Sequence, residues 1–304
     1  MPLEEFVEVM TKDGKVLNLI LKEVKDAEDL WKLVDVQVSA WGIGPDKLDV
    51  VPVHVLKAAS DNSGMVIGVY EVETGKAVGF AWGFLAKDDE GLYFYSHQSG
   101  VVEDYKYSGI GFRIKQFQRK VALSRGLKRM RWTFDPLQAL NTRFNLGKLG
   151  VVSNDYRVNF YGRMTDSLNR GLRSDRLKVW WYLDSRRVEL KAEGRLKSPS
   201  FKQALEAGAT LALEVEEGMH RRPVKLREVD GDLALIEIPY DINASKRDGT
   251  APVWREFTGR AFLNLFSSGF YDFECVVDKE NWRVFHVLWR APLEEILEGE
   301  TPFS

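Results

Sequence analysis

The sequence predicts a mixed α+β fold, in which helices flank a mostly antiparallel sheet. Two strand-like stretches, Met65–Val72 and Ala77–Phe84, flank a short glycine-containing turn, which is typical of a β-hairpin. A third strand-like stretch, Leu92–Val102, follows and makes three successive antiparallel strands. Amphipathic helical spacing lies apart from these strands, in Ile110–Val121 and in Val253–Phe266.

Length and composition bound the class of protein. The 304 residues, of which 44% are hydrophobic, can build two domains with packed cores. The chain has 43 Lys and Arg against 45 Asp and Glu, and this net charge of −2 argues against a nucleic-acid partner. Its single cysteine, Cys275, excludes an internal disulfide and leaves no cluster for zinc, so we expect no metal.

The N-terminus carries the acidic sequence MPLEEFVEVM, which does not have the pattern of a signal peptide. The sequence also lacks an apolar run long enough to span a bilayer. We therefore expect a cytoplasmic protein without a membrane partner.

The first elements have clear start signals. A strand is expected at Asn18–Val24, and Asp26 is a good N-cap for a helix that runs towards Trp41. Its carboxylate can accept hydrogen bonds from the free amides of the first turn. A short helix is expected at Val51–Ala59. Pro52 would stand in its first turn, where the missing N–H group of a proline costs little stability.

The stretch Leu92–Phe112 is predicted to contain a strand, a glycine loop and the start of a helix. Alternation places the odd positions of the strand on one face, which mixes aromatic, imidazole and hydroxyl groups. Gly109 and Gly111 stand where the helix begins, so its unpaired amides can bind an anion such as a phosphate. A plain structural turn is the alternative. The residues of the odd face are Tyr93, Tyr95, His97, Ser99 and Val101.

The helix that follows has one apolar stripe, at the spacing of a helix that packs on a sheet. We expect its basic side chains to lie mostly off this stripe. The stripe consists of Ile110, Ile114, Phe117 and Val121, and the basic residues are Arg113, Lys115, Arg119 and Lys120.

Two linked motifs surround this helix. Lys106-x-x-Gly109-x-Gly111 precedes it, and Asn141–Gly150 comes after the strand-like Met130–Phe134. The first motif resembles the (Q/R)xxGx(G/A) signature of the GNAT superfamily of N-acyltransferases, with Lys in place of Gln or Arg. The second is similar to the N-x-x-(A/F)…K-x-G-F helix of that family. The resemblance covers Asn18–Leu183 and points to a branch that carries the string WTFDPLQxxN.

The resemblance implies an acyl-CoA cofactor, acetyl-CoA in the first place, and a sheet that splays between Leu92–Val102 and Met130–Phe134. The pantetheine arm would pair with the exposed strand edge like an added strand. The pyrophosphate would lie on the amides at the start of the helix. The implied cofactor residues are Val101, Lys106, Tyr107, Ser108, Gly109, Ile110, Gly111, Phe112, Asn141 and Phe144.

The implied chemistry is direct transfer of the acyl group to an amine, without a covalent enzyme intermediate. His97 would take the proton of the amine, and Tyr95 would position a water or relay the proton. The tyrosine with which many family members protonate the thiolate is replaced by Leu146, so Tyr161 or Tyr156 would take its place, or no acid is needed. A His97 that only hydrogen-bonds across strands is the alternative.

The acceptor is expected to be an amine of a small molecule, an amino acid or a protein. In the family, the segment that holds His54 commonly walls the acceptor cleft, so His54 either faces the substrate or is an ordinary surface histidine. A loop with Arg170, Arg173 and Arg176 either binds a carboxylate or is solvated and self-paired. Carboxylate binding favours a succinyl-CoA-type N-acyltransferase acting on amino acids as the enzymatic alternative. A non-catalytic acyl-CoA-binding module is the alternative of another class.

We expect an acyl-CoA-binding domain over residues 1–184 and a smaller α+β domain over 185–304, which covers the acceptor cleft or forms a homodimer. Asp135 is read as an ordinary turn residue rather than a ligand, and an N-cap residue is the alternative for Asn141. Neither His220 nor His286 is assigned to a site. The C-terminal elements expected are a linker at Ser185–Leu196, a helix within Ser198–Ala207, and two hairpins, Val224–Val229 with Leu233–Pro239 and Phe273–Val277 with Val284–Leu288.

Overall fold

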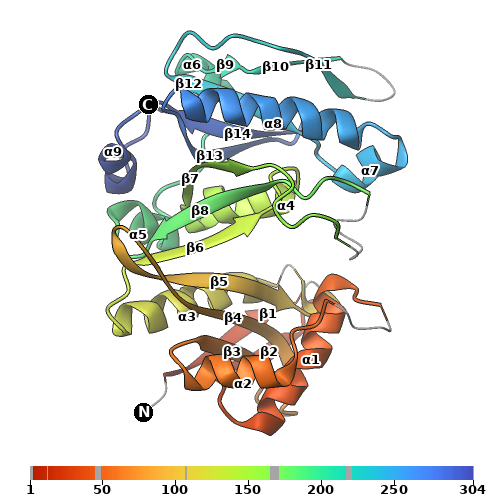
Figure 1. Ribbon diagram of the computed structural model, residues 1–304, viewed down its shortest axis with the longest axis vertical. Helices are drawn as coiled ribbons and strands as arrows, with labels where there is room; N and C mark the ends of the chain where they lie inside the picture. The colour runs from red at the N-terminus through yellow and green to blue at the C-terminus, as the bar shows by residue number, and fades with distance from the viewer. Residues whose placement is uncertain are drawn as a thin grey trace. The chain divides into compact units, whose positions relative to one another are not determined.

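The computed structural model describes residues 3–11, 13–44, 49–106, 108–164, 171–216 and 221–303 (Figure 1). The chain forms two compact units: unit 1 comprises Met1–Trp132, and unit 2 comprises Thr133–Met164 and Gly171–Ser304. The boundary predicted after Asp184 separates two domains that fold independently. Compact units do not show independent folding, so this boundary stays a prediction. Of the helices in these described ranges, none combines the length and the apolar character that crossing a bilayer takes.

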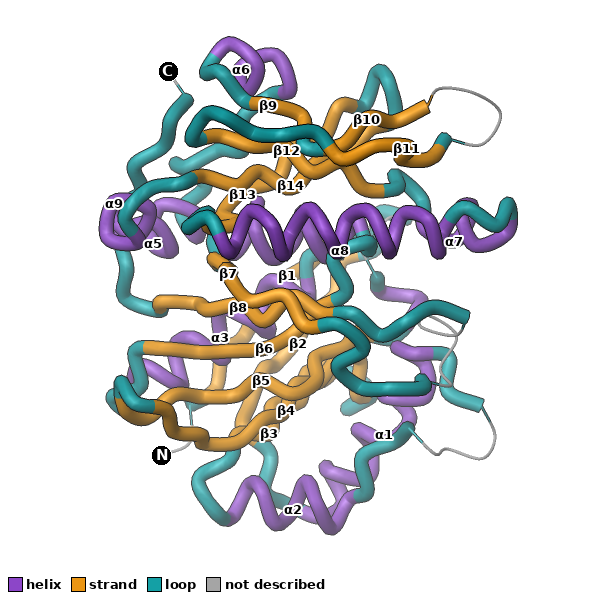
Figure 2. Tube along the Cα trace, turned by 45° about the horizontal axis from the view of Figure 1, so that its top comes forward, coloured by secondary structure: helices purple, strands orange, loops and turns teal. Residues whose placement is uncertain are grey.

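Unit 1 is built on a sheet with the strand order β1-β2-β3-β4-β5-β6 (Figure 2). Neighbouring strands are antiparallel except β5 and β6, which are parallel. The predicted hairpin is confirmed as β3 and β4, and the predicted third strand as β5. The strands are β1 (Glu4–Met10), β2 (Val16–Glu23), β3 (Met65–Glu71), β4 (Ala77–Asp88), β5 (Gly91–Val101) and β6 (Arg129–Phe134).

The first helix of unit 1 begins where the sequence predicts. Asp26 Oδ1 accepts hydrogen bonds from the amides of Glu28 and Asp29 at 2.9 and 3.3 Å, and Gly42 ends the helix with a left-handed φ of 58°. The second helix follows Pro52, as expected. The helices are α1 (Ala27–Trp41), α2 (Val53–Asp61) and α3 (Ile110–Ser124), with a short 3-10 turn, η1, at Glu103–Tyr105.

Helices α1 and α3 cover opposite faces of this sheet. A Cβ added to Gly79 of β4 would lie 3.0 Å from Ile114 of α3. A Cβ added to Gly100 of β5, which is paired with Phe80, would lie 2.8 Å from Ala40 of α1. Because Gly79 and Phe80 are neighbours on one strand, their side chains point to opposite faces. The sheet of unit 1 is thus the middle layer between two helical layers.

In unit 2 the strands follow the order β8-β7-β13-β14-β12-β9, and β10 and β11 form a separate pair. The helix within Ser198–Ala207, the helix Val253–Phe266 and the hairpin Phe273–Val277 with Val284–Leu288 are confirmed as α6, α8 and β13–β14. The strands are β7 (Val152–Arg157), β8 (Arg176–Tyr182), β9 (Thr210–Leu211), β10 (Leu213–Glu216), β11 (Arg222–Leu226), β12 (Leu233–Ile238), β13 (Tyr271–Asp278) and β14 (Arg283–Trp289). The helices are α4 (Ala139–Thr142), a π-helical segment η2 (Arg143–Leu149), α5 (Arg186–Ala192), α6 (Phe201–Glu206), α7 (Ile242–Arg247), α8 (Ala251–Ser267) and α9 (Leu293–Glu298).

Two predictions for unit 2 are wrong. The segment Ser185–Leu196 is not a plain linker, because it contains α5, whose Arg187 and Lys191 are buried beside Glu274. The hairpin expected at Val224–Val229 does not form either. β11 pairs with β10, whereas β12 pairs with β14 and β9. A turn signal alone cannot show which strand its neighbours will pair with.

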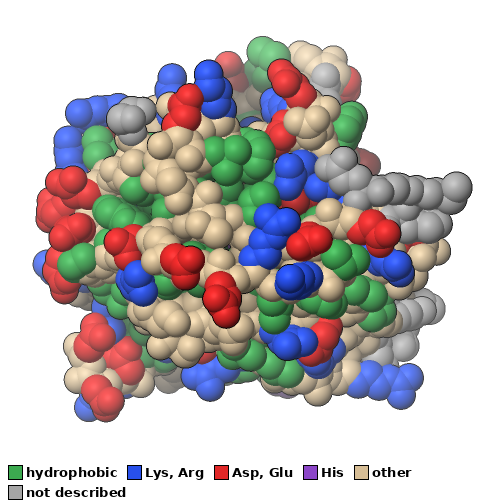
Figure 3. All heavy atoms as spheres, turned by 90° about the horizontal axis from the view of Figure 1, so that it is seen from above, with side chains coloured by type: hydrophobic (Ala, Val, Ile, Leu, Met, Phe, Trp, Pro, Cys, Tyr) green, Lys and Arg blue, Asp and Glu red, His purple; other side chains and the backbone are tan. Residues whose placement is uncertain are grey.

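Charges of both signs lie side by side on the molecular surface. On the face seen in Figure 3, Lys and Arg side chains are interspersed with Asp and Glu side chains. This pattern agrees with the near-zero net charge of −2. The absence of a nucleic-acid partner stays a prediction.

Candidate functional site

The residues predicted for the site are divided between the two units. Unit 1 brings together Tyr95, His97, Val101 and the loop from Lys106 to Phe112, and it also holds His54. Tyr107 and Arg170 lie outside the described residues. Unit 2 holds Asn141, Phe144, Tyr161 and Arg176.

The sheet of unit 1 opens between β5 and β6. Their parallel ladder consists of Phe94 opposite Met130 and Tyr95 opposite Arg131. Both strands continue beyond these pairs, and the described residues show no further pairing between them. The predicted splay of the sheet is confirmed. The edge of β5 from Ser96 onward therefore offers backbone groups to which an extended ligand could hydrogen-bond.

The loop after β5 enters α3 through Gly109, which has a left-handed φ of 88°. Within the described ranges, the amides of Gly109, Ile110 and Gly111 donate no hydrogen bond. A Cβ added to Gly109 or Gly111 would meet nothing within 4 Å. The start of α3 therefore presents free amides and the positive end of the helix dipole, which suits an anion. Phe112 differs from the other three, because its amide already donates to Gly109 O at 3.1 Å.

The side chains of this loop are already engaged with one another. The ammonium of Lys106 forms an ion pair with Glu103 one turn earlier. The hydroxyl of Ser108 donates to Tyr105 O at 2.6 Å. Because Glu103 offsets the charge of Lys106, the amides of α3 are the stronger attraction for an anion at this loop.

A β-bulge interrupts the pairing of β4 with β5. The register shifts between Trp82 and Gly83 of β4, which leaves His97 as the extra residue of β5. The prediction that all odd positions of this strand share one face is therefore wrong. Alternation reverses at the bulge, so that Ser99 and Val101 turn towards α3 whereas His97 does not.

His97 lies in an aromatic cluster on the face of the sheet that α1 covers. Its ring centroid is 5.0 Å from that of Trp82 and 6.3 Å from that of Tyr95, which in turn stacks on Phe84 at 5.3 Å. The side chain keeps an exposed edge, but burial of the rest of the ring lowers the pKa of His97. His97 is thus neutral at neutral pH and can accept a proton.

The two tyrosines considered as proton donors differ in access. Tyr156 is buried, and burial together with the 2.6 Å hydrogen bond that its hydroxyl donates to Asp175 raises its pKa. Tyr161 is 41% exposed, and its hydroxyl shares a 2.9 Å hydrogen bond with Thr133 Oγ1. Tyr161 is therefore the more accessible candidate for a general acid.

The arginines that follow are tied to their own loop. Arg173 binds the carboxylate of Asp175 with two hydrogen bonds, of 2.7 and 2.8 Å. Arg176 is buried, donates to Asp175 O at 2.8 Å and lies 5.4 Å from the ring centroid of Tyr161. The self-paired alternative therefore holds for Arg173, and a role of Arg176 in substrate binding stays a prediction.

The remaining predicted residues lie on three helical segments. Asn141 is exposed on α4, Phe144 is half-buried on η2, and His54 is exposed on α2. Leu146, at the position of the missing tyrosine, is fully buried. The proposed contacts of Asn141 and Phe144 with a cofactor, and of His54 with a substrate, stay predictions.

Sequence reasoning missed a buried polar cluster between α3 and β5. Lys115, Gln118 and Ser96 are 5%, 0% and 3% exposed. The ammonium of Lys115 donates to Ser96 Oγ at 2.9 Å and lies 3.9 Å from the ring centroid of Trp132. The prediction that Lys115 lies off the packed stripe is wrong. The available signal was its spacing from Gln118, which puts both on one face of the helix.

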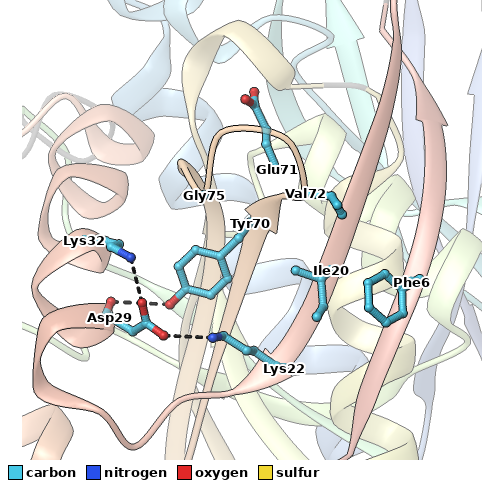
Figure 4. A pocket seen from close by; sticks show the side chains of 9 residues that line it. All are labelled: Phe6, Ile20, Lys22, Asp29, Lys32, Tyr70, Glu71, Val72 and Gly75. Carbon is cyan, nitrogen blue, oxygen red and sulfur yellow. Dashed lines mark hydrogen bonds and ion pairs between the residues drawn. The ribbon is translucent and has the colours of Figure 1, made fainter.

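A pocket of about 270 Å³ also lies in unit 1, bordered by β1, β2, β3 and α1 (Figure 4). Asp29 accepts hydrogen bonds from Lys22 and Lys32, each 2.8 Å long, beside the ring of Tyr70. Burial alone would raise the pKa of Asp29, but these two ammonium groups hold it below its usual value. Both lysines of this pocket are thus already paired with Asp29.

Unit 2 also contains two buried polar pairs that were not predicted. Asp135 accepts from the amide of Leu137 at 2.9 Å, which confirms its role in a turn, and also binds Arg255 through bonds of 2.8 and 2.6 Å. His286 Nδ1 lies 2.7 Å from Asp272 Oδ2, and both residues are fully buried. Asp135 and Arg255 are far apart in sequence, whereas Asp272 and His286 lie on the adjacent strands β13 and β14.

Neither a protein-family model nor a curated protein sequence matches the chain. Solved structures resemble it in part. The ribosomal-protein-S18-alanine N-acetyltransferase from Escherichia coli has 14% identity and a TM-score of 0.43, over 54% of this chain and 94% of that one. An acetyltransferase of the GNAT family from Streptococcus pneumoniae has 12% identity and a TM-score of 0.42, over 53% and 97%. Aminoglycoside 6'-acetyltransferase type Ii has 16% identity and a TM-score of 0.42, over 54% and 96%.

Proposed function

We propose that the chain is an acyl-CoA-dependent N-acyltransferase, which moves a short acyl group, acetyl in the simplest case, to an amine. The observation that carries the proposal is the parting of β5 and β6 next to the free amides of Gly109, Ile110 and Gly111. In the proposed complex, the pyrophosphate of CoA lies on these amides. The pantetheine arm pairs with the edge of β5 between Val101 and Ser96, a span of roughly 17 Å at about 3.3 Å per residue.

The reaction is a direct attack of the amine on the thioester. The nitrogen bonds to the carbonyl carbon, the C–S bond breaks, and CoA leaves as a thiolate. The amine must lose a proton, and the neutral imidazole of His97 accepts it. His97 follows Ser96, where the two strands part, so the base stands at the end of the strand edge that the pantetheine would occupy. Tyr95 is the candidate that positions a water beside it.

Residues of unit 2 complete the proposal. Tyr161 is the candidate that returns a proton to the thiolate, and Asn141 and Phe144 are the candidates that contact the pantetheine. The roles of Asn141 and Phe144 are supported by the resemblance of Asn141–Gly150 to the family motif, and that of Tyr161 by its exposure. The acceptor class, a small-molecule, amino-acid or protein amine, is left to an amine screen.

A titration tests the cofactor site. We expect acetyl-CoA to bind saturably to the wild-type chain, and the paired changes Gly109→Glu and Gly111→Glu to weaken this binding at least tenfold. Two carboxylates at the start of α3 would repel a pyrophosphate and fill the space that it needs. Calorimetry gives the dissociation constants, and Asp232→Glu, a change at an exposed acidic residue of unit 2, is the control. A folded wild-type chain that binds no CoA thioester would end the proposal.

The pH dependence of turnover should report His97. Only the neutral imidazole can accept a proton, so kcat should fall on acidification, as His97 becomes protonated. Partial burial lowers the pKa of His97, so this acid limb should lie below the usual histidine value of about 6.5. Measuring kcat against pH for the wild type and for His97→Gln locates this acid limb. An acid limb that persists unchanged in the variant would assign it to another group.

A further inference from the structure

The most unusual charged group in unit 1 is the buried lysine of α3. Lys115 is 5% exposed, and its ammonium contacts one hydrogen-bond acceptor, Ser96 Oγ at 2.9 Å, and the face of the Trp132 ring at 3.9 Å. An ammonium has three N–H donors, so two find no acceptor among the described residues. A buried cation in this condition is costly, and an anion that reaches it would be stabilised.

Among the described residues, no carboxylate forms an ion pair with Lys115. The strands packed against it present Phe94 and Ser96 from β5, and Met130 and Trp132 from β6, none of which ionises in the physiological range. From β4 come Gly79 and Ala81. The nearest ionisable side chains along these strands, those of His97 and Arg131, belong to the opposite face by alternation and by the bulge. Burial lowers the pKa of Lys115 to about 7.

The place of this cation matters as much as its charge. Ser96 and Trp132 are the first α3-facing residues beyond the last paired residues of β5 and β6, so Lys115 lies at the point where the strands part. If the pantetheine arm follows the edge of β5 from the start of α3, its acyl end arrives at Ser96. His97 and Lys115 then lie next to the acyl group from the two faces of the sheet.

We propose that Lys115 binds the terminal carboxylate of the acyl group, so that the preferred donors are CoA thioesters of dicarboxylic acids, such as succinyl-CoA. This inference rests on the proposed function, since it takes the acyl-CoA site as given. A carboxylate would supply the acceptors that the ammonium lacks and a charge-assisted hydrogen bond in a dry site. An acetyl group has no carboxylate and could offer Lys115 neither the additional acceptors nor the opposite charge.

The test compares succinyl-CoA with butyryl-CoA, which has the same chain length but no carboxylate. Calorimetric titration of the wild-type chain should give about 10- to 100-fold tighter binding of succinyl-CoA, the effect of one hydrogen bond to a charged partner. Titrations near neutral pH, in buffers with different ionisation enthalpies, should also show uptake of about half a proton with succinyl-CoA only. At that pH the carboxylate would complete the protonation of a half-neutral Lys115.

Variants assign the effect to the residue. Lys115→Met should abolish both the preference for succinyl-CoA and the proton uptake, and Lys115→Arg should retain the preference without the uptake. Lys120→Met is the matched control, because Lys120 lies on the same helix with its side chain 51% exposed and should change neither. Thermal unfolding of each variant shows whether it is folded.

The outcomes separate the inference from the function on which it rests. Equal binding of succinyl-CoA and butyryl-CoA by the wild type would overturn the role of Lys115 and leave an acyl-CoA-binding chain. A preference that survives in Lys115→Met would also overturn it. A folded wild type that binds no CoA compound at all would overturn the proposed function, and the inference with it.

Discussion

Replacing His97 by glutamine is expected to lower kcat about 100-fold to 10,000-fold, the usual contribution of a positioned general base. The imidazole is the extra residue of the β5 bulge, has an exposed edge, and is held neutral by the aromatic rings around it. Glutamine keeps a polar side chain of similar length but cannot accept a proton. Steady-state rates of CoA release with a saturating amine measure the effect.

Two controls make this prediction specific to catalysis. The dissociation constant for CoA should change by less than about threefold in His97→Gln, because the proposed pyrophosphate site is at the start of α3 and not at the bulge. His97→Ala should recover part of its lost rate in added imidazole, since the exposed edge leaves room for a free base. A kcat within about threefold of the wild type would mean that water removes the proton and that His97 has no catalytic role. A chain that binds acyl-CoA but releases no CoA with any amine would instead be a binding module.

Elements with local signals were predictable from the sequence. The start of α1 follows from the carboxylate of Asp26, and the β3–β4 hairpin follows from a short turn between two runs of strand-forming residues. The glycine loop before α3 was likewise found by its motif. In each case the cause and the structure lie within a few residues of one another.

Features that depend on a distant partner were not predictable. The bulge at His97 is a property of how β4 and β5 pair, and simple alternation therefore placed Ser99 and Val101 on the wrong face. The burial of Lys115 depends on Ser96 and Trp132, which belong to two other strands. A lysine also counts as a surface residue in any pattern of apolar periodicity. Lys115, on which the acyl preference is proposed to rest, was thus among the four basic residues that the pattern placed off the packed stripe.

The buried charges of unit 2 were not predicted from the sequence for the same reason. Arg187 and Lys191 made α5 look like a charged linker, whereas both side chains are buried beside Glu274. Glu274 itself also accepts from Ser198 at 2.7 Å. A run of charged residues indicates an exposed segment only if the groups that neutralise its charges are exposed as well. Here the neutralising carboxylate is that of Glu274, which is buried on β13.

Replacing Asp135 by alanine is expected to lower the free energy of unfolding by about 3–5 kcal/mol, without acting on the chemistry. Asp135 binds Arg255 in a two-bond geometry, and the two residues are 7% and 3% exposed. Removing the carboxylate leaves a buried guanidinium without a counter-charge, and it also removes the acceptor for the amide of Leu137. Denaturant unfolding of the two proteins measures the loss.

Removing both charges should cost much less than removing one. In the double variant Asp135→Leu with Arg255→Met, no uncompensated charge remains, and most of the lost stability should return. Asp232→Ala breaks the ion pair with Arg290, whose side chains are 67% and 44% exposed, and should change stability by less than about 1 kcal/mol. If Asp135→Ala were no worse than Asp232→Ala, the pair would contribute nothing beyond a surface contact. If the double variant were as unstable as the single one, the loss would come from the turn at Leu137 and not from the stranded charge.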